Sequence, residues 1–470
     1  MCSSPSSRRN CITTATPCLR GSGVTCWTCD ERGAGQCGGP PGGDSRIGFE
    51  SSWYYATARG LVDRPPLDGD ADCDVCIVGA GYTGLSAAIS LAERGYRVRV
   101  VECHRVGAGA SGRNGGVLGM GQRLDQEELE AWLGDAHAAE LWRISVAANS
   151  CVREFVDRFR IACDLTDGHL LVAHKARHEG GLHAHAEHLA KKYGYADILP
   201  LDRDEVRARL GVDTFYGGCL DRRAGHLHPL NYALGLAAAA ESVGAIIHER
   251  TTATSVDASA DGVVLRTDRG NVRAKFAILA CNGYLGRLDR GIEGYQMPIN
   301  NFMLATQPLG ATRAQSINRD NLAVVDTRFV VNYFHNSPDH RLVFGGGENY
   351  TSRFPANLKA MVRRRMLAVY PQLHDVAIDY VWGGTLAITL RRMPQFGRRD
   401  GVIYWAQGYS GHGVAMATLG GRMVAEAIAG QAERFDVMAR IPQMRFPGGR
   451  YLRWPALVAG MLWYSLLDRL

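Results

Sequence analysis

Hydrophobic residues first form a regular pattern between positions 74 and 102. Residues 74–79 (Asp-Val-Cys-Ile-Val-Gly) are a short apolar run that ends at glycine, which is typical of a buried parallel strand. Residues 85–92 then place apolar side chains at helical spacing, and Gly95 ends the predicted helix. Residues 97–102 (Arg-Val-Arg-Val-Val-Glu) form a second predicted strand. The pattern therefore predicts one β-turn-α-β unit.

Both kinds of element continue along the chain. Periodicity predicts helices over residues 224–243, 357–370 and 413–429, and strands over 245–247, 329–333, 341–345 and 402–406. Pro229 lies near the first turn of the helix over 224–243. Residues 251–281 alternate as a small antiparallel ribbon, which ends with 276–280. This mixture predicts an α/β chain that is α+β overall, and 470 residues fit two domains.

The first 46 residues lack this periodicity. They are rich in Ser, Gly, Pro, Thr and Cys, so we expect a disordered tail, although an over-extended reading frame explains them equally well. Aromatic residues enter at Trp53-Tyr54-Tyr55, and Pro65-Pro66 makes a stiff approach to the first strand. We therefore expect folded structure to begin near residue 47.

Charge and composition exclude several classes of protein. The 53 basic and 47 acidic residues are interspersed, which argues against a nucleic-acid-binding arm. No apolar run reaches the ~18 residues of a membrane span, and the N-terminus lacks the apolar stretch of a secretory signal. The sequence therefore predicts a cytoplasmic protein without a transmembrane segment. Its oligomeric state is left open.

The 13 cysteines do not form a disulfide framework, because six lie in the first 37 residues and the others are scattered. Cys26 and Cys29 have half of a zinc-ribbon spacing, but no second pair follows nearby. Cys73 and Cys76 border a predicted strand and are expected to be buried thiols. Three histidines lie in a polar stretch and are expected on a surface helix rather than on a metal: His183, His185 and His188. No metal site is predicted.

Glycine is abundant, with 56 residues, well above the usual share of about 7%. One cluster, Gly79-Ala-Gly81-Tyr82-Thr83-Gly84, follows the first strand at once. Its three glycines allow a tight turn, a close approach of a pyrophosphate and close packing of helix on strand. Glu102 ends the second strand, where an acidic residue binds ribose hydroxyls. The unit therefore predicts a dinucleotide site for FAD or NAD rather than NADP.

A second glycine-rich loop at residues 107–116 favours FAD. It follows Glu102 directly and can lie along an extended cofactor, which an NAD site does not need. As an isolated string it could also be a flexible turn. The residues expected to line FAD in this loop are Ser111, Arg113, Asn114, Gly115 and Gly116.

A third loop, residues 408–413, joins a predicted strand to a predicted helix. Its amides and the positive helix end could face the negative charge that a reduced flavin carries at its N1/C2-carbonyl edge. The alternatives are an ordinary glycine turn with an exposed His412, or a protonated His412 that raises the flavin potential. No second dinucleotide unit is present for a nicotinamide. Electrons are therefore expected to come from the substrate and to leave to dioxygen or another acceptor.

With these residues in view, the chain resembles the D-amino-acid-oxidase-type family of FAD-dependent oxidoreductases. The resemblance runs from about Trp53 to the end and rests on six strings: DVCIVGAGYTGLSAA, VGAGASGRNGG, AGHLHPLNYALGLA, RLVFGGG, QGYSGHGV, and AERFD with FPGGR. Residues 1–46 have no counterpart in it.

The resemblance implies a two-domain fold. A Rossmann-like FAD domain would combine three segments, and a substrate domain with a mixed sheet would cover the flavin. The implied ranges are 47–161, 220–290 and 384–446 for FAD, and 162–219 and 291–383 for the substrate. Residues 447–470 would be a docking segment. If the enzyme served a membrane acceptor, that segment could instead be an interfacial anchor.

The resemblance also implies site residues. FAD would be lined by Gly79, Gly81, Tyr82, Thr83, Gly84, Glu102, Ser111, Arg113, Asn114, Gly115, Gly116, Ala253 beside the adenine, Gly408, Ser410, Gly411, His412 and Gly413. Strands around Tyr333 and residues 345–347 would face the isoalloxazine. Tyr333, His335 and Glu348 are the candidates for the substrate pocket, and Glu348 could attract a cationic end of the substrate. No catalytic side chain is assigned, because the flavin carries the chemistry.

Two departures from relatives concern the substrate. Sarcosine-oxidase-like relatives bond the flavin through a cysteine in the stretch that matches 382–385, and the absence of cysteine there implies non-covalent FAD. Relatives that oxidise small α-amino acids place a carboxylate-binding arginine near the position of Leu386. Arg391 follows Leu386 by only five residues. An apolar side chain at position 386, however, offers no guanidinium fork to bind a carboxylate.

These departures favour an amine oxidase. The resemblance then implies oxidation of gamma-glutamylputrescine or a related polyamine derivative to an aldehyde, with release of ammonia and hydrogen peroxide. The alternative is a D-amino-acid or glycine/sarcosine-type dehydrogenase or oxidase that passes electrons to another acceptor. A third hypothesis is a flavin-binding subunit without activity.

Overall fold

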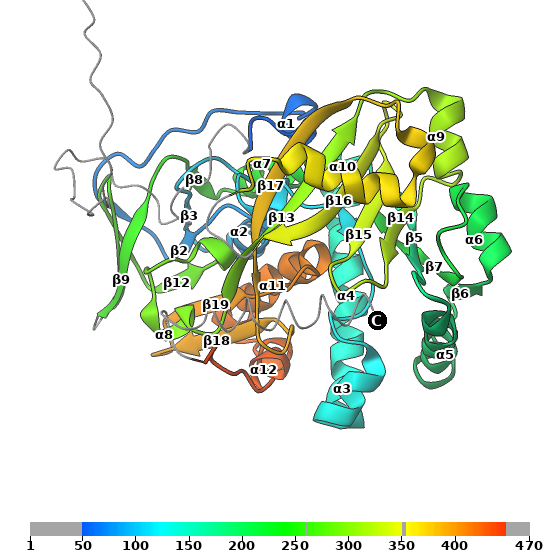
Figure 1. The fold of residues 1–470 in the computed structure, drawn as a ribbon. Helices are drawn as coiled ribbons and strands as arrows, with labels where there is room; N and C mark the ends of the chain where they lie inside the picture. Colours follow the sequence, from blue (N-terminus) through cyan, green and yellow to red (C-terminus); the bar gives the residue numbers. More distant parts are fainter. Residues whose placement is uncertain (1–48, 260, 350–353, 448–470) are drawn as a thin grey trace, which may run out of the picture. The chain divides into compact units, whose positions relative to one another are not determined.

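The computed structural model describes residues 49–259, 261–349 and 354–447 (Figure 1). The predicted tail over 1–46, the Cys26 and Cys29 pair, and residues 448–470 of the predicted docking segment lie outside these ranges. Three sheets organise the described residues, with six, nine and four strands. The division of the chain into domains at the expected boundaries stays a prediction.

The six-stranded sheet contains the predicted β-turn-α-β unit. Its order is β18 (Gln395–Arg399), β19 (Ile403–Gln407), β12 (Phe276–Leu279), β2 (Val75–Val78), β3 (Val98–Val101) and β8 (Ile246–His248). All pairs are parallel except β18 with β19. Every residue of β2 is buried, as expected of a parallel strand covered on both faces. Segments far apart in the sequence thus share one sheet.

Two helices begin directly after strands of this sheet. Helix α2 (Tyr82–Ala92) follows β2, and α11 (Gly413–Ile428) follows β19. The helices approach so closely that a Cβ on Gly421 would lie 2.1 Å from the Thr83 carbonyl oxygen. Both predicted helix starts are therefore confirmed, and the two helices pack against each other.

The ribbon predicted over 251–281 is correct only in its first part. Strands β9 (Ala253–Ser259), β10 (Gly262–Thr267) and β11 (Asn271–Ala274) are antiparallel, and β1 (Ala71–Asp72) adds to β11. Strand β12 instead pairs in parallel with β2 and β19. The prediction was wrong for 276–280 because this uninterrupted apolar run is a buried parallel strand rather than an alternating one.

Two other predicted boundaries were wrong. Helix α7 begins at Pro229 rather than at 224, because residues 224–226 complete strand β7 (Gly218–His226). The His228 side chain accepts from the Asn231 N–H and caps the helix. Strand β15 (Asn332–Asn336) begins three residues later than the predicted start at 329.

The nine-stranded sheet is mixed, as the resemblance implied for one of the two domains; its role in covering the substrate stays a prediction. Along the path its order is β17 (Ile378–Ile388), β13 (Met297–Thr306), β16 (Leu342–Asn349), β15, β14 (Ala323–Asp326), β5 (Thr166–Val172), β7 and β4 (Val117–Leu118), and β6 (Ile198–Leu201) also pairs with β7. Only β14 with β5 is parallel among these pairs.

The remaining helices of the described ranges surround these sheets (Figure 1). They are α1 (Trp53–Ala56), α3 (Gln126–Leu133), α4 (Asp135–Phe159), α5 (Ala176–Tyr193), α6 (Arg203–Leu210), α8 (Arg290–Glu293), α9 (Ala311–Ile317), α10 (Leu358–Val369) and α12 (Glu433–Ala439). The amphipathic helix predicted over 357–370 is thus confirmed as α10. Across the described ranges, no helix is both long enough and apolar enough to span a membrane.

The two faces of the nine-stranded sheet pack against different cores. On one face, Phe334 and Phe344 join Val362 of α10 in a separate core. Neighbouring residues of a strand point to opposite faces, so Tyr333 and Gly345 point to the other face. Pairing extends this row across the sheet through Met303 to Trp382, and Met303 and Trp382 belong to the same core as α2 and α11. We call this second face the inner face.

Candidate functional site

The three glycine-rich loops meet in the structure. The Tyr82 N–H donates to the Ser111 hydroxyl (3.1 Å), and the Tyr82 hydroxyl donates to the Ser111 carbonyl (2.5 Å), which joins the first loop to the second. The hydroxyls of Thr83 and Tyr409 are 2.7 Å apart, which joins the first loop to the third. Loops separated by more than 300 residues therefore form one polar surface at the starts of α2 and α11.

The glycines of the first loop are required by close contacts. A Cβ on Gly79 would lie 2.8 Å from the Ala280 oxygen, and a Cβ on Gly81 would lie 2.8 Å from the Ser111 Oγ. A Cβ on Gly84 would lie only 2.0 Å from the Gly79 carbonyl oxygen. The third glycine thus permits the close packing of helix on strand that a dinucleotide loop needs.

Glu102 lies directly beside this loop. Its Oε2 accepts from the Ala80 N–H and its Oε1 from the His104 N–H, both at 2.9 Å. The Thr251 N–H donates to the Glu102 carbonyl (2.9 Å), so Ala253 at the start of β9 lies two residues from the same edge. A carboxylate has further lone pairs beyond these two bonds. Ribose hydroxyls could therefore donate to it.

In the second loop, the side chains bond to the protein's own backbone. Arg113 donates from Nε to the Ala108 oxygen (2.8 Å) and from Nη1 to the Gly383 oxygen (3.2 Å). The Asn114 Oδ1 accepts from the Gly116 N–H (2.7 Å), and Gly116 has a φ of 70°. Arg113 and Asn114 thus fix the shape of the loop. Because these side chains are already bonded, we expect the loop to contact a cofactor mainly through its backbone.

The third loop is held in a strained turn. Ser410 has a φ of 52° and donates its N–H to the Ala387 oxygen (3.0 Å). His412 is the N-cap of α11, its side chain makes no capping bond, and Gly413 is the first residue of the helix. Gly408 and Gly411 also have positive φ. The amides of this turn therefore lie at the positive end of a long helix.

His412 differs from both sequence-based alternatives. Its ring lies against Gly119, where a Cβ would come within 2.7 Å, and its Nε2 is buried without a hydrogen-bond partner among the described residues. Burial lowers the pKa of His412 to about 4, so the imidazole is neutral at neutral pH. Neither an exposed turn residue nor a protonated imidazole describes this geometry.

These residues fit FAD. The N-cap of α2 is Gly81, which has no side chain to cap the helix, and the first amide, the Tyr82 N–H, donates to Ser111 of the second loop. Gly79 and Gly81 allow the backbone of the first loop to approach Ala280 and Ser111 closely, and Glu102 supplies an acceptor at the ribose position. The buried Nε2 of His412 offers one more polar contact. Pyrophosphate, ribose and flavin could each find a partner of suitable chemistry.

Tyr333 joins the second glycine loop to the inner face of the mixed sheet. Its ring lies so close to two glycines that a Cβ on Gly115 would come within 2.4 Å and a Cβ on Gly345 within 2.1 Å. Its hydroxyl donates to the Oδ1 of Asn301. The absence of two side chains therefore makes room for one aromatic ring between the cofactor loop and the sheet.

The other two substrate candidates also lie on strands β15 and β16. Glu348 pairs with Asn301 in the register of the sheet. Burial raises the pKa of Tyr333, and the negative charge of Glu348 raises it further. His335 stacks on His226 with 4.2 Å between ring centroids. Its Nδ1 lies 3.0 Å from the Asn336 oxygen, so the neutral ring carries its lone pair on Nε2. The three candidates thus lie on adjoining strands.

Three residues near Tyr333 were not predicted from the sequence. Asn301 orients the Tyr333 hydroxyl, Trp382 donates from Nε1 to the Arg113 oxygen (3.1 Å), and Tyr54 packs on Trp382 with ring centroids 5.1 Å apart. The pairing register of β13 and β17 brings Asn301 and Trp382 close to Tyr333. This register could not be predicted from the sequence. The aromatic run that contains Tyr54 was a visible signal.

Several sequence candidates lie on other contacts. His185 and His188 of α5 are 2.8 and 2.9 Å from Glu127 and Glu130 of α3. His183 bonds the Leu201 oxygen. Within the ranges that the structure describes, no group of three His, Cys, Asp or Glu side chains could hold a metal. Cys73 and Cys76 are buried free thiols, and burial raises the pKa of Cys73 to about 11. Both are structural.

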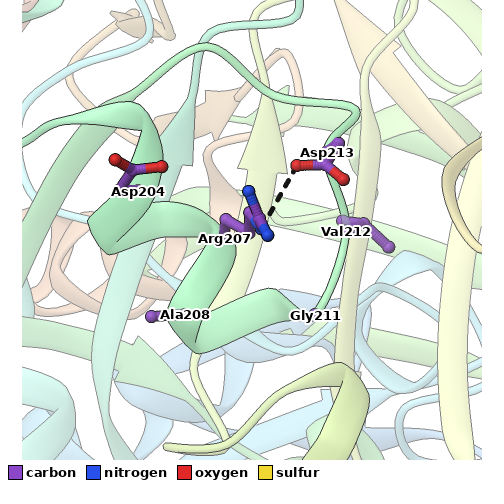
Figure 2. Close-up of a pocket in the computed structure, with 6 residues that line it drawn as sticks. All are labelled: Asp204, Arg207, Ala208, Gly211, Val212 and Asp213. Atoms are coloured by element: carbon purple, nitrogen blue, oxygen red, sulfur yellow. Dashed lines mark ion pairs between the residues drawn. The ribbon is translucent and has the colours of Figure 1, made fainter.

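Arg391 and a hollow on the protein surface contact residues other than the three glycine-rich loops. The Arg391 guanidinium lies over the Trp132 ring, 5.0 Å from its centroid. A hollow of about 430 Å³ beside α6 is lined by residues that the sequence did not single out (Figure 2): Asp204, Arg207, Ala208, Gly211, Val212 and Asp213. Its Arg207 and Asp213 form an ion pair of 3.3 Å.

Replacing Glu102 by glutamine tests the ribose position. The carboxylate now accepts hydrogen bonds from two backbone N–H groups. In the glutamine variant, the side-chain NH2 would face one of these N–H groups and could not accept from it. We expect FAD to bind about tenfold or more weakly, since hydrogen bonds to a charged group contribute roughly 1.5–3 kcal/mol. Quenching of FAD fluorescence on the apoprotein measures the Kd. Glu187→Gln, which loses only a surface pair with Lys191, is the control. Equal affinity in both variants would contradict the assignment.

Comparisons with known proteins agree with this geometry. A family model described as FAD dependent oxidoreductase (DAO) matches residues 74–427. Gamma-glutamylputrescine oxidoreductase of Escherichia coli (strain K12) is 40% identical over 421 residues, which cover 89% of this chain and 98% of that protein. A probable oxidoreductase OrdL of Rhizobium meliloti (strain 1021) is 38% identical over 418 residues, covering 89% and 97%.

Solved structures support the fold. Glycine oxidase from Geobacillus kaustophilus superposes with a TM-score of 0.67 at 21% identity, covering 78% of this chain and 97% of that chain. L-proline dehydrogenase from P. horikoshii gives the same TM-score and identity, covering 80% and 98%. With the glycine loops, Glu102 and the mixed sheet arranged as described, the chain belongs to the DAO family of FAD-dependent oxidoreductases.

Proposed function

We propose that the chain oxidises an amine of the gamma-glutamylputrescine type to an aldehyde, with non-covalently bound FAD and dioxygen as the electron acceptor, in the cytoplasm. The observation that carries this proposal is the position of Tyr333, whose ring lies between Gly115 of the cofactor loop and Gly345 of the inner face. A molecule bound beside this ring would lie between the cofactor loop and the polar groups of β13, β15 and β16. The name of the Escherichia coli relative supports this substrate class.

The reaction balances as amine plus dioxygen plus water giving aldehyde, ammonia and hydrogen peroxide. Bound FAD supplies the hydride acceptor that takes two electrons from the carbon–nitrogen unit and returns them to dioxygen. The protein's contribution is placement and electrostatics. Tyr333, oriented by Asn301, and the Glu348 carboxylate would hold the amine end of the substrate.

The composition of strand β17 supports an amine over an α-amino acid. Residues 382–385 of β17 contain no arginine and no cysteine, and Leu386 is apolar. Arg391 lies on Trp132 instead of on the inner face. A carboxylate beside the reacting carbon would therefore lack the planar fork that binds it best. The same stretch offers no thiol for a covalent flavin bond.

Anaerobic titration tests the proposal. Purified holoprotein is mixed separately with gamma-glutamylputrescine, putrescine, sarcosine, glycine and D-alanine while the flavin absorbance is followed. We expect gamma-glutamylputrescine to bleach the flavin, and hydrogen peroxide to form when air returns. Bleaching by D-alanine or glycine alone would reject the amine substrate in favour of an amino-acid oxidase or dehydrogenase. Colour that remains after acid precipitation and washing would reject non-covalent binding.

A further inference from the structure

The short helix α1 lies before the part of the chain that matches the family model, yet it reaches the residues around Tyr333. The family match begins at residue 74, whereas α1 spans Trp53–Ala56. Tyr54 of this helix is fully buried. Its ring packs on Trp382 and on His228, with centroids 5.1 and 5.0 Å apart. An element that precedes the residues matched by the family model thus contributes a ring beside the inner face.

Helix α1 is fixed rather than loosely attached. Ser52 caps it by accepting from the Tyr55 N–H (3.1 Å). The Thr57 hydroxyl lies 3.0 Å from the Nε2 of His228, and the Arg59 N–H donates to the Asn231 Oδ1 (2.8 Å). These bonds attach the segment to the start of α7. The position of Tyr54 is therefore set by specific contacts on both sides of the helix.

The Tyr54 hydroxyl is a buried polar group without a hydrogen-bond partner among the described residues. Leaving such a group unpaired destabilises the fold, so folded proteins rarely do so without a reason. Tyr333 and Tyr82 are near enough to add to the rise in the pKa of Tyr54 that burial causes. Through its ring contact with Trp382, Tyr54 lies next to the inner-face row that contains Tyr333.

The nearby cofactor-loop groups already have partners. The Tyr82 hydroxyl donates to the Ser111 and Pro229 carbonyls, and the Arg113 carbonyl accepts from Trp382. Tyr54 is therefore not needed to complete the loop that would hold FAD. A phenol hydroxyl can accept a hydrogen bond from an N–H, and the ring that carries this one packs on the rings of His228 and Trp382. Such a group suits an amine.

We propose that Tyr54 is a substrate-binding residue whose hydroxyl accepts a hydrogen bond from the substrate amine, so that α1 completes the amine subsite beside Tyr333. This inference rests on the proposed function, since it takes the substrate to be an amine. It extends the site to a segment that lies before the residues matched by the family model.

The test uses Tyr54→Phe, which removes the hydroxyl and keeps the ring. Tyr370→Phe is the matched control, because Tyr370 is equally buried but its hydroxyl donates to the Ile317 oxygen (2.6 Å) in the core on the opposite face of the sheet. Two ligands that cannot be oxidised are titrated into each holoprotein while the flavin spectrum is followed. One is gamma-glutamylputrescine with two methyl groups on the carbon that bears the terminal putrescine amine. The other is the same compound with a methyl group in place of that terminal amine.

We expect Tyr54→Phe to bind the amine ligand about tenfold more weakly, the equivalent of one hydrogen bond, and to bind the methyl ligand as the parent does. Its melting temperature should stay equal or rise, since an unpaired hydroxyl is removed, whereas Tyr370→Phe should melt lower and bind both ligands normally. Equal loss for both ligands, or unchanged amine binding by Tyr54→Phe, would overturn the inference. Failure of the parent itself to respond to any amine would instead reject the proposed function.

Discussion

Alanine at position 84 is expected to give a protein that purifies without flavin and unfolds more readily. The added Cβ would lie 2.0 Å from the Gly79 carbonyl oxygen and 3.2 Å from Ile77 Cγ2. Both Gly79 and Gly84 are parts of rigid, buried elements, so α2 must move away from β2. Overpacking of this kind costs roughly 1–3 kcal/mol, occasionally more. The first amides of α2 would move with the helix and leave the cofactor surface.

The measurements are the flavin-to-protein absorbance ratio and the free energy of unfolding in urea. Gly180→Ala provides the control, because Gly180 lies inside helix α5 with nothing within 4 Å of an added Cβ. That change should be neutral or should stabilise the protein by up to about 1 kcal/mol. A Gly84→Ala protein that kept a full complement of FAD would show that the close contact does not position the cofactor loop.

Stability is expected to fall steeply as the pH drops below 6.5. Six wholly or partly buried histidines have lowered pKa values because burial disfavours their charged form: His169, His335 and His412 to about 4, His228 to about 3, and His226 and His248 in the same direction. In the unfolded chain each would titrate near 6.5. The unfolded state therefore binds more protons between pH 6.5 and 4, and the stability present above pH 6.5 is lost as the pH falls toward the folded pKa.

The expected size of this effect is large. Each such histidine contributes up to about 1.4 kcal/mol per pH unit within the window. Five of them would contribute up to about 14 kcal/mol over two pH units, which is similar to the total stability of a typical protein, roughly 5–15 kcal/mol. Urea unfolding between pH 4.5 and 7.5, with FAD in fixed excess, measures the slope. His335→Gln should reduce the slope by about one proton, and His374→Gln on the exposed surface should not. Identical slopes in all three proteins would contradict the role of buried histidines.

The β-turn-α-β unit could be predicted because every signal for it is local. Strand, glycines, helix and acidic residue lie within about thirty positions, and the structure places them as the pattern indicated. The assignment of β12 to the ribbon failed because its neighbours β2 and β19 are distant in the chain. An apolar run of four residues does not specify its partner strands. The start of α7 was misplaced because β7 continues to His226, just before the cap.

The candidate site shows the same division. The glycine loops were visible because a particular backbone conformation demands glycine. Asn301 was not visible, since only the register that pairs it with Glu348 and Gly384 brings it to Tyr333. The sequence marked Tyr54 as part of an aromatic run, but its contact with Trp382 depends on where α1 is anchored.

The bond between the hydroxyls of Thr83 and Tyr409 joins residues 326 positions apart. During synthesis, the strand and helix that begin the dinucleotide unit leave the ribosome long before the third loop exists. The surface where all three loops meet can therefore form only when nearly the whole chain has emerged. Capture of FAD would then be a late event in the biogenesis of this enzyme, and a chain that stopped before residue 408 would carry the dinucleotide fingerprint without the completed surface.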